Sequence, residues 1–123
     1  MVTSGSQVWL LSDGWCTDVS AAHTLVRLKR HADVRAAIVV DALEHALAPA
    51  GDYVFETDAG RRRVDLSATS ARAELRNRLA QGSRALAKAC DEASVPWAML
   101  ATSDEPDAGL APLLRRRVVE RRR

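Results

Sequence analysis

The sequence is poor in cysteine and aromatic residues and has no long apolar run, and each shortage excludes a class of protein. The two cysteines, Cys16 and Cys90, lack metal-ligand or redox spacing, so we expect small buried thiols in a reducing, cytoplasmic setting. No apolar run approaches the roughly 18 residues that a membrane-spanning helix needs. Residues 1–6 also lack the charged and apolar regions of a signal peptide.

The composition is that of one small globular domain. The chain has 123 residues, of which 47% are hydrophobic and 28% charged, too apolar a balance for a disordered protein. Aromatic residues make up only 4%, so leucine, valine and alanine must build the core. We therefore expect residues 1–123 to form a single domain.

Charge is unevenly placed along the chain. Residues 115–123 carry six arginines and one glutamate, a basic tail of +5, which leaves −3 on residues 1–114 of a chain whose net charge is +2. A basic run can attract nucleic acid, with an affinity that falls steeply with salt. Arginines at a chain end are more often a solvated helix terminus, which positive charge stabilises. Because aromatic stacking platforms are not interleaved with these arginines, we expect no nucleic-acid partner.

Three short apolar runs end close to an aspartate. Residues 8–12 precede Asp13, residues 36–40 precede Asp41, and a run that begins after Pro96 leads to Asp104. Such continuous apolar runs are typical of parallel strands buried on both faces. Ligand sites of open α/β sheets lie beyond the carboxyl ends of parallel strands. The three aspartates are therefore predicted to lie along one acidic rim.

The segments between these runs predict helices and one hairpin. We expect a helix over residues 18–31 capped by Asp18, and a hairpin of residues 53–55 and 64–66 joined by Asp58-Ala59-Gly60 with a positive φ at Gly60. A single long helix starting near Thr69 or Ser70 is predicted, followed by a short one near residues 110–118. The apolar stripe of the long helix is Leu75, Leu79, Gly82, Leu86, Ala89 and Ala93. The predicted fold class is α/β with three layers, a mainly parallel sheet and an inserted β-hairpin.

With its elements in this order, the chain resembles a known family on a set of short marks. The marks are Leu11-Ser12-Asp13, Arg30-His31-Ala32-Asp33-Val34, Val39-Val40-Asp41-Ala42-Leu43-Glu44, Leu47-Ala48-Pro49-Ala50-Gly51, residues 54–60 with Val64-Asp65, Cys90, Thr102, Asp104, and Leu110 with residues 113–117. They are similar to the C-terminal half of the bacterial family called domain of unknown function 58, whose core resembles von Willebrand factor A domains. Two departures are Ala42, where the family usually has proline, and Gly14, where it has an aromatic residue. The family's N-terminal half has no counterpart here, so we expect an incomplete, partial domain.

The resemblance implies a metal rim and a protein partner. Asp13 would be the acidic third-loop residue of a metal-ion-dependent adhesion site, with Ser12 and Asp104 as further ligands for Mg²⁺ and oxygens of Thr17 and Asp18 nearby. The alternative is that Asp13 and Asp18 only cap the following turn and helix. Proteins of this family are typically associated with MoxR-type AAA+ ATPases, so such an ATPase is the implied partner.

Other candidate residues favour structural roles. Asp41 and Glu44 form a carboxylate pair without a visible nucleophile, so they are expected to bond turn amides. The spacing of His23, His31 and His45 fits no zinc motif, and Cys16 has no evident base.

The preferred hypothesis is a non-enzymatic protein-interaction module. The alternative is a small divalent-metal-dependent hydrolase that needs Asp13, Asp41 and Asp104 around one cation. A thin parallel core also predicts marginal stability or self-association, with an exposed apolar patch where further strands would pack.

Overall fold

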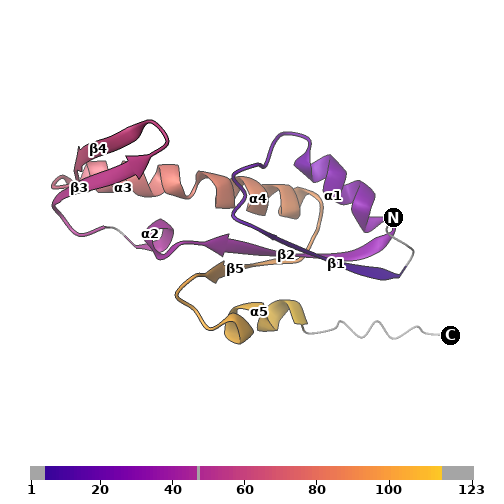
Figure 1. The fold of residues 1–123 in the computed structure, drawn as a ribbon. Coiled ribbons are helices and arrows are strands. Elements are labelled where there is room, and N and C mark those ends of the chain that lie inside the picture. Colours follow the sequence, from indigo (N-terminus) through magenta and orange to yellow (C-terminus); the bar gives the residue numbers. More distant parts are fainter. Residues whose placement is uncertain (1–4, 47, 115–123) are drawn as a thin grey trace.

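A three-stranded parallel sheet forms the centre of the computed structural model, which describes residues 5–46 and 48–114. Strand β2 (Ala32–Val40) lies between β1 (Ser6–Ser12) and β5 (Trp97–Ala101), as Figure 1 shows. Trp9 of β1 aligns with Arg35 of β2, and Ala36 of β2 aligns with Trp97 of β5. The parallel sheet predicted from the three apolar runs is therefore confirmed. The predicted burial on both faces holds for residues 36–38 and Val40 of β2 but is wrong for β1, an edge strand in which no residue is fully buried.

The two faces of β2 pack against different helices. Its even-numbered residues are buried in one core cluster with residues of α1 (Ala21–Lys29) and α4 (Gln81–Glu92). The odd-numbered residues of β2 face the other side of the sheet, since side chains alternate along a strand. There Ala37 is fully buried and the Arg35 guanidinium donates to the Leu113 carbonyl of α5 (Pro106–Leu114). Helices thus lie on both faces, α5 over β5 and not over all of the sheet, and the three-layer α/β arrangement is confirmed (Figure 1).

The inserted hairpin is present and forms a second, separate sheet. Strands β3 (Asp52–Thr57) and β4 (Gly60–Asp65) pair antiparallel between the end of β2 and α3 (Thr69–Leu79). Gly60 has a φ of +104°, as predicted, but Thr57 pairs directly with it. The connection therefore has two residues, Asp58 and Ala59, and the predicted three-residue loop is wrong.

The long helix predicted from the apolar stripe is divided at Ala80, which has a ψ near zero. The second part, α4, buries Gly82, Leu86 and Ala89 against the sheet, whereas α3 has no buried residue. Figure 1 shows the reason: α4 lies over the sheet and α3 continues beyond it toward the hairpin. The predicted cap of α3 is also wrong, because Ala68 occupies that position and makes no side-chain bond.

The start of α1 and the segment after β2 also differ from the prediction. Helix α1 begins at Ala21, because the Asp18 carboxylate accepts bonds from the backbone N–H and hydroxyl of Ser20 one turn earlier. An unpredicted single turn, α2 (Ala42–His45), follows β2. The predicted continuation of the last helix to Val118, and the basic tail at 115–123, lie outside the described residues.

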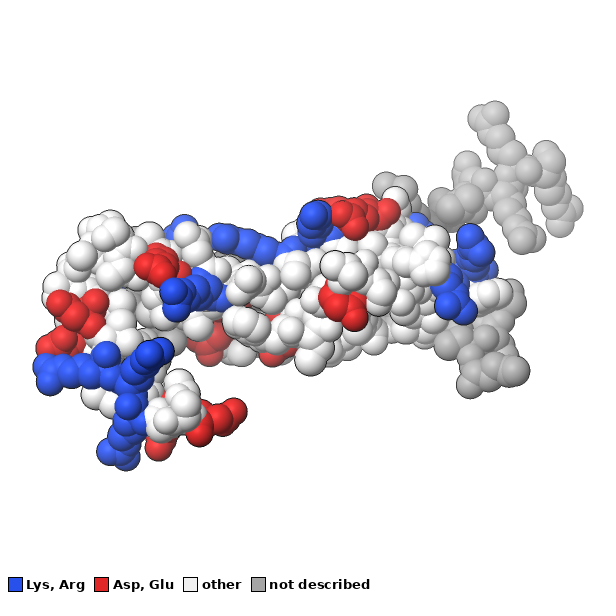
Figure 2. Space-filling model, turned by 90° about the horizontal axis from the view of Figure 1, so that it is seen from above, with Lys and Arg blue, Asp and Glu red and all other residues white. Residues whose placement is uncertain are grey.

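Charged side chains are unevenly distributed over the surface. In Figure 2, seen from the side of α1 and α4, basic side chains project at the hairpin end, where β4 carries Arg61, Arg62 and Arg63. The middle of this face is mostly white, that is, uncharged. Within the described part of the chain, no helix is both long and apolar enough to cross a membrane.

Candidate functional site

The three strand-end aspartates lie at the carboxyl edge of the sheet, as predicted. Asp13 directly follows β1, Asp41 directly follows β2, and Asp104 lies three residues beyond β5; all three are exposed. Over residues 5–46 and 48–114, however, no three side chains of His, Cys, Asp or Glu come together as a metal-binding group. The three-carboxylate centre that the hydrolase alternative requires is therefore not assembled there.

Asp41 and Glu44 have the structural role that was expected of them. The Asp41 carboxylate accepts the Leu43 N–H at 2.9 Å, and the Glu44 carboxylate accepts the Asp41 N–H at 3.3 Å. This reciprocal pair is a capping box that starts α2. The second Glu44 oxygen accepts a bond from the buried Ser83 hydroxyl at 3.3 Å, which joins α2 to α4.

Ser12 and Asp13, the first two predicted metal ligands, bond to the turn that follows them. The Ser12 hydroxyl accepts the Gly14 N–H and the Asp13 carboxylate accepts the Trp15 N–H, both at 3.1 Å. Asp104, the third predicted ligand, follows β5, which β2 separates from β1, so the strand ends lie about 10 Å apart. Mg²⁺ holds its ligands at about 2.1 Å. The arrangement therefore fits the ion poorly, and the Mg²⁺ site stays a prediction.

The turn after β1 is fixed by a close approach to α4. Gly14 has a φ of +84°, and a methyl group there would lie 2.6 Å from the carbonyl carbon of Gly82 and closer still to its oxygen. A methyl group on Gly82 would in turn lie 2.9 Å from the Trp15 nitrogen. Two glycines are thus needed for the loop to rest directly on the helix backbone. The sequence shows both glycines but not that they meet.

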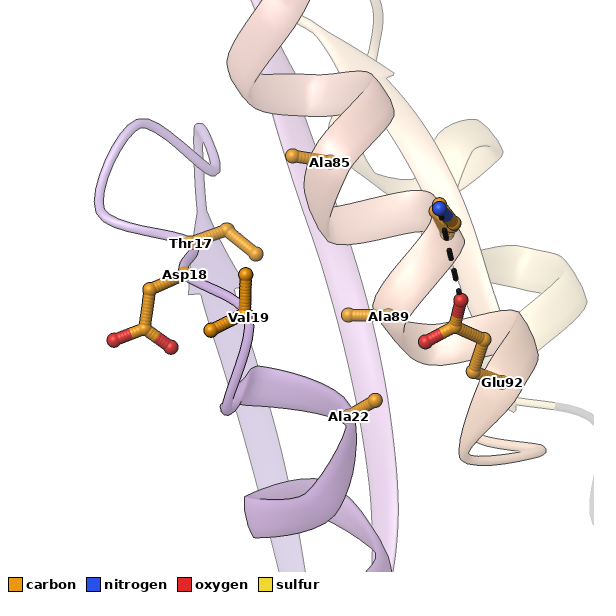
Figure 3. A pocket seen from close by; sticks show the side chains of 8 residues that line it. Thr17, Asp18, Val19, Ala22, Ala85, Ala89 and Glu92 are labelled. Carbon is orange, nitrogen blue, oxygen red and sulfur yellow. Dashed lines mark ion pairs between the residues drawn. The ribbon is translucent and has the colours of Figure 1, made fainter.

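A shallow pocket of about 420 Å³ lies between this loop and α4. It is lined by Thr17, Asp18, Val19, Ala22, Ala85, Lys88, Ala89 and Glu92 (Figure 3). Small alanines form its floor, Lys88 and Glu92 pair with each other at 3.8 Å, and the Asp18 carboxylate points away from the alanines. Two hydrogen bonds from Ser20 lower the pKa of Asp18 below the ordinary 3.8; the bond from the hydroxyl has the larger effect and the bond from the N–H the smaller.

A second hollow runs along the outer edge of β1. This edge groove has a volume of about 410 Å³ and lies between β1, α1 and the loop before α1. Its apolar lining includes Val8, Leu10, Leu25, Leu28 and Leu86.

The two cysteines differ in environment. Cys16, which also lines the edge groove, is exposed, so its predicted burial is wrong; the turn on Gly14 carries it outward. Cys90 is buried as expected, and burial raises the pKa of its thiol. His23 and His31 are exposed at α1 and just after it.

On the opposite face of β1, an apolar side chain is left exposed by residues 5–46 and 48–114. Leu11 is 62% exposed, although it lies in the strand beside the fully buried Ala37 of β2. Trp9, on the same face, has the Arg35 guanidinium 5.6 Å from the centre of its ring. Helix α5 packs on β5, and no residue that the structure describes buries Leu11. Leu11 and the half-buried Trp9 thus form a small apolar surface on the face of the sheet, whereas the expected patch was one where further strands would pack.

The outer edge of β1 has backbone groups without a neighbouring strand. Even-numbered residues of β2 bond to the β5 side, since Ala36 donates to Pro96 and Val40 accepts from Thr102. The backbone of Arg35 therefore faces β1, and Trp9 directly opposite turns its own N–H and C=O outward. Gln7 and Leu11 do the same by alternation. In the described part of the chain, β1 pairs with β2 alone.

No family model, no curated protein and no solved structure matches this chain. The likeness to the domain of unknown function 58 family therefore stays a prediction from the residues quoted above. What the structure itself establishes is an α/β layout in which helices flank a three-stranded parallel sheet.

Proposed function

We propose that this chain is a non-enzymatic protein-interaction module, and, following the family resemblance, that its partner is a MoxR-type AAA+ ATPase. The observation that carries the proposal is the uncovered sheet face of β1. Leu11, 62% exposed, and the half-buried Trp9 form an apolar surface there beside Arg35. Sheet faces are normally covered, and an exposed apolar patch marks an interaction site.

The chemistry of the rim supports recognition rather than hydrolysis. The carboxylates of Asp13 and Asp41 each hold a backbone N–H of the next turn. The alternative, a metal-dependent hydrolase, needs both of them and Asp104 around one cation. The structure uses these carboxylates to shape loops at the end of the sheet, so we retain the interaction module alone.

The test is a binding titration of the full chain against a purified MoxR-type ATPase from the same organism. Leu11→Arg removes an apolar contact and adds a charge, so affinity should fall about tenfold or more. The matched control is Val54→Arg, since Val54 is 66% exposed on a strand of the separate hairpin sheet. It should leave the dissociation constant unchanged.

Two outcomes would count against the proposal. Equal loss in the Leu11 and Val54 variants would show that the uncovered face of β1 is not the binding surface. Failure of the unsubstituted chain to bind would remove the ATPase as the partner.

A further inference from the structure

We propose that the outer edge of β1 pairs antiparallel with the same edge of a second copy of this chain, with the two-fold axis at Trp9. Two three-stranded sheets then become one six-stranded sheet in the order β5-β2-β1-β1-β2-β5. The proposal rests on the strand edge, whereas the proposed function rests on the uncovered sheet face. Each can therefore fail without the other.

The outer edge of β1 is unprotected. Gln7, Trp9 and Leu11 turn their N–H and C=O groups outward, and no described strand lies on that side. Natural edge strands are usually protected by charged residues, proline or a bulge. Strand β1, with the sequence SQVWLLS, contains none of these residues, and its seven residues pair with β2 without interruption. It is a long, regular and uncharged edge.

Strand β1 is complementary to β1 of a second copy when the two run antiparallel. Antiparallel pairing about Trp9 places Val8 opposite Leu10, Gln7 opposite Leu11, and Trp9 opposite Trp9 of the other copy. Opposite residues of an antiparallel pair lie on the same face. Val8 and Leu10 of both copies would therefore join the two edge grooves, whose apolar linings they already share. No pair in this register opposes two charges of the same sign.

The two ends of the edge groove carry opposite charge. The acidic end lies near the end of β1, where Asp18 lines the groove. The basic end lies beside an adjoining hollow lined by Arg27 and Arg30, which shares Thr24 and Leu28 of α1 with the groove. Helix α1 leads from one end of the groove to the other. Antiparallel pairing therefore brings the acidic end of one copy beside the basic end of the other, which favours this orientation.

The occupant is a second copy because these features are matched within one chain. A dimer of this form leaves Trp9 and Leu11 open on the α5 side. It also satisfies the outward backbone groups that would otherwise be left to water. The self-association expected from a thin parallel core thus receives a definite geometry.

The test compares two double variants by sedimentation equilibrium of the full chain. Gln7→Glu with Leu11→Glu places like charges opposite each other twice across the axis, and should weaken dimerisation about tenfold or more. Gln7→Lys with Leu11→Glu places opposite charges at the same points and should restore the wild-type dimer to within about threefold. Both positions are exposed, and within one strand they lie about 13 Å apart. Gln7 lies beside Asp33 of β2, so Gln7→Glu also adds a repulsion within the monomer that Gln7→Lys does not. Urea unfolding of both variants at a concentration where they are monomeric measures that difference separately.

Amide hydrogen exchange tests the register independently. The N–H groups of Val8 and Leu10 bond to β2 and should exchange slowly at every protein concentration. Those of Gln7, Trp9 and Leu11 should become protected only as the concentration rises.

Three results would overturn the pairing. They are a wild-type chain that is monomeric at millimolar concentration, equal dimerisation of the two double variants, or rapid exchange of the three outward amides in the dimer. A monomeric chain that still loses partner binding on Leu11→Arg would overturn the pairing alone and leave the proposed function in place.

Discussion

Replacing Gly14 with alanine tests whether the turn after β1 is held by direct contact with α4. The added methyl group would lie 2.6 Å from the carbonyl carbon of Gly82, whereas carbon atoms in contact are about 3.5–4 Å apart. The neighbour is helix backbone and not the end of a flexible side chain. The loop or the helix must therefore move by about 1 Å.

The expected cost has two sources. A residue with a side chain pays about 1–2 kcal/mol for the left-handed region, into which the φ of +84° falls. Overpacking against a structure that cannot easily move adds about 1–3 kcal/mol. A total near 3 kcal/mol is a large share of the roughly 5–15 kcal/mol by which domains are stable. With a urea slope of about 2 kcal/mol per molar, the unfolding midpoint should fall by about 1.5 M.

Urea unfolding followed by tryptophan fluorescence measures this change, because Trp9, Trp15 and Trp97 all belong to the sheet or its adjoining loop. Gly60→Ala is the control. Gly60 also has a positive φ, +104°, but no described atom lies within 4 Å of a methyl group built there. The control should show at most the cost of the backbone conformation. Equal losses in the two variants would refute the contact with Gly82.

Two further predictions concern the ends of helices. Ser94, just after α4, has a φ of +52°, so Ser94→Gly should stabilise the chain by about 1 kcal/mol, seen as a higher urea midpoint; a lower midpoint would contradict this. The lowered pKa of Asp18 favours its ionised form in the folded state, so this contribution is present above the ordinary pKa of 3.8 and is lost as the pH falls through the lower folded value. A carboxyl NMR titration should show the pKa of Asp18 rising toward 3.8 in Ser20→Ala, and an unchanged pKa would exclude Ser20 as its main cause.

The strands and the hairpin could be predicted because their signals are local, although the apolar run of β1 did not show that Leu11 is exposed. A strand buried on both faces has to be apolar throughout, and the run ending at Val40 is apolar for that reason. Gly60 marks the hairpin turn because its backbone conformation favours glycine wherever the chain folds. In these cases no distant residue changes the outcome.

The division at Ala80 could not be predicted, because the apolar stripe continues through it. Leu75 and Leu79 follow the same spacing as Leu86, but only the residues of α4 lie over the sheet. Helical spacing shows which side of a helix is apolar. It does not show where the surface that covers that side ends.

The rim was predicted in position, and the bonding of turn amides was predicted for Asp41 and given as the alternative to metal binding for Asp13. The sequence places Asp13, Asp41 and Asp104 after three strands, and parallel pairing puts the strand ends at one edge. Whether a carboxylate is free to bind an ion depends on the next two or three residues of backbone. Asp13 and Asp41 both accept an N–H from the residue two positions later, which is the most local bond available to them.

These local bonds connect the rim to the edge of the sheet. Ser12 and Asp13 shape the turn that carries Gly14 onto α4, and this turn fixes the carboxyl end of β1. The same strand forms one wall of the edge groove and presents Leu11 on its other face. Ser12 and Asp13, two of the three predicted metal ligands, therefore hold the turn at the end of a regular, uncharged edge strand. A strand held rigidly in this way loses little conformational entropy when a second strand pairs with it, which favours association at this edge.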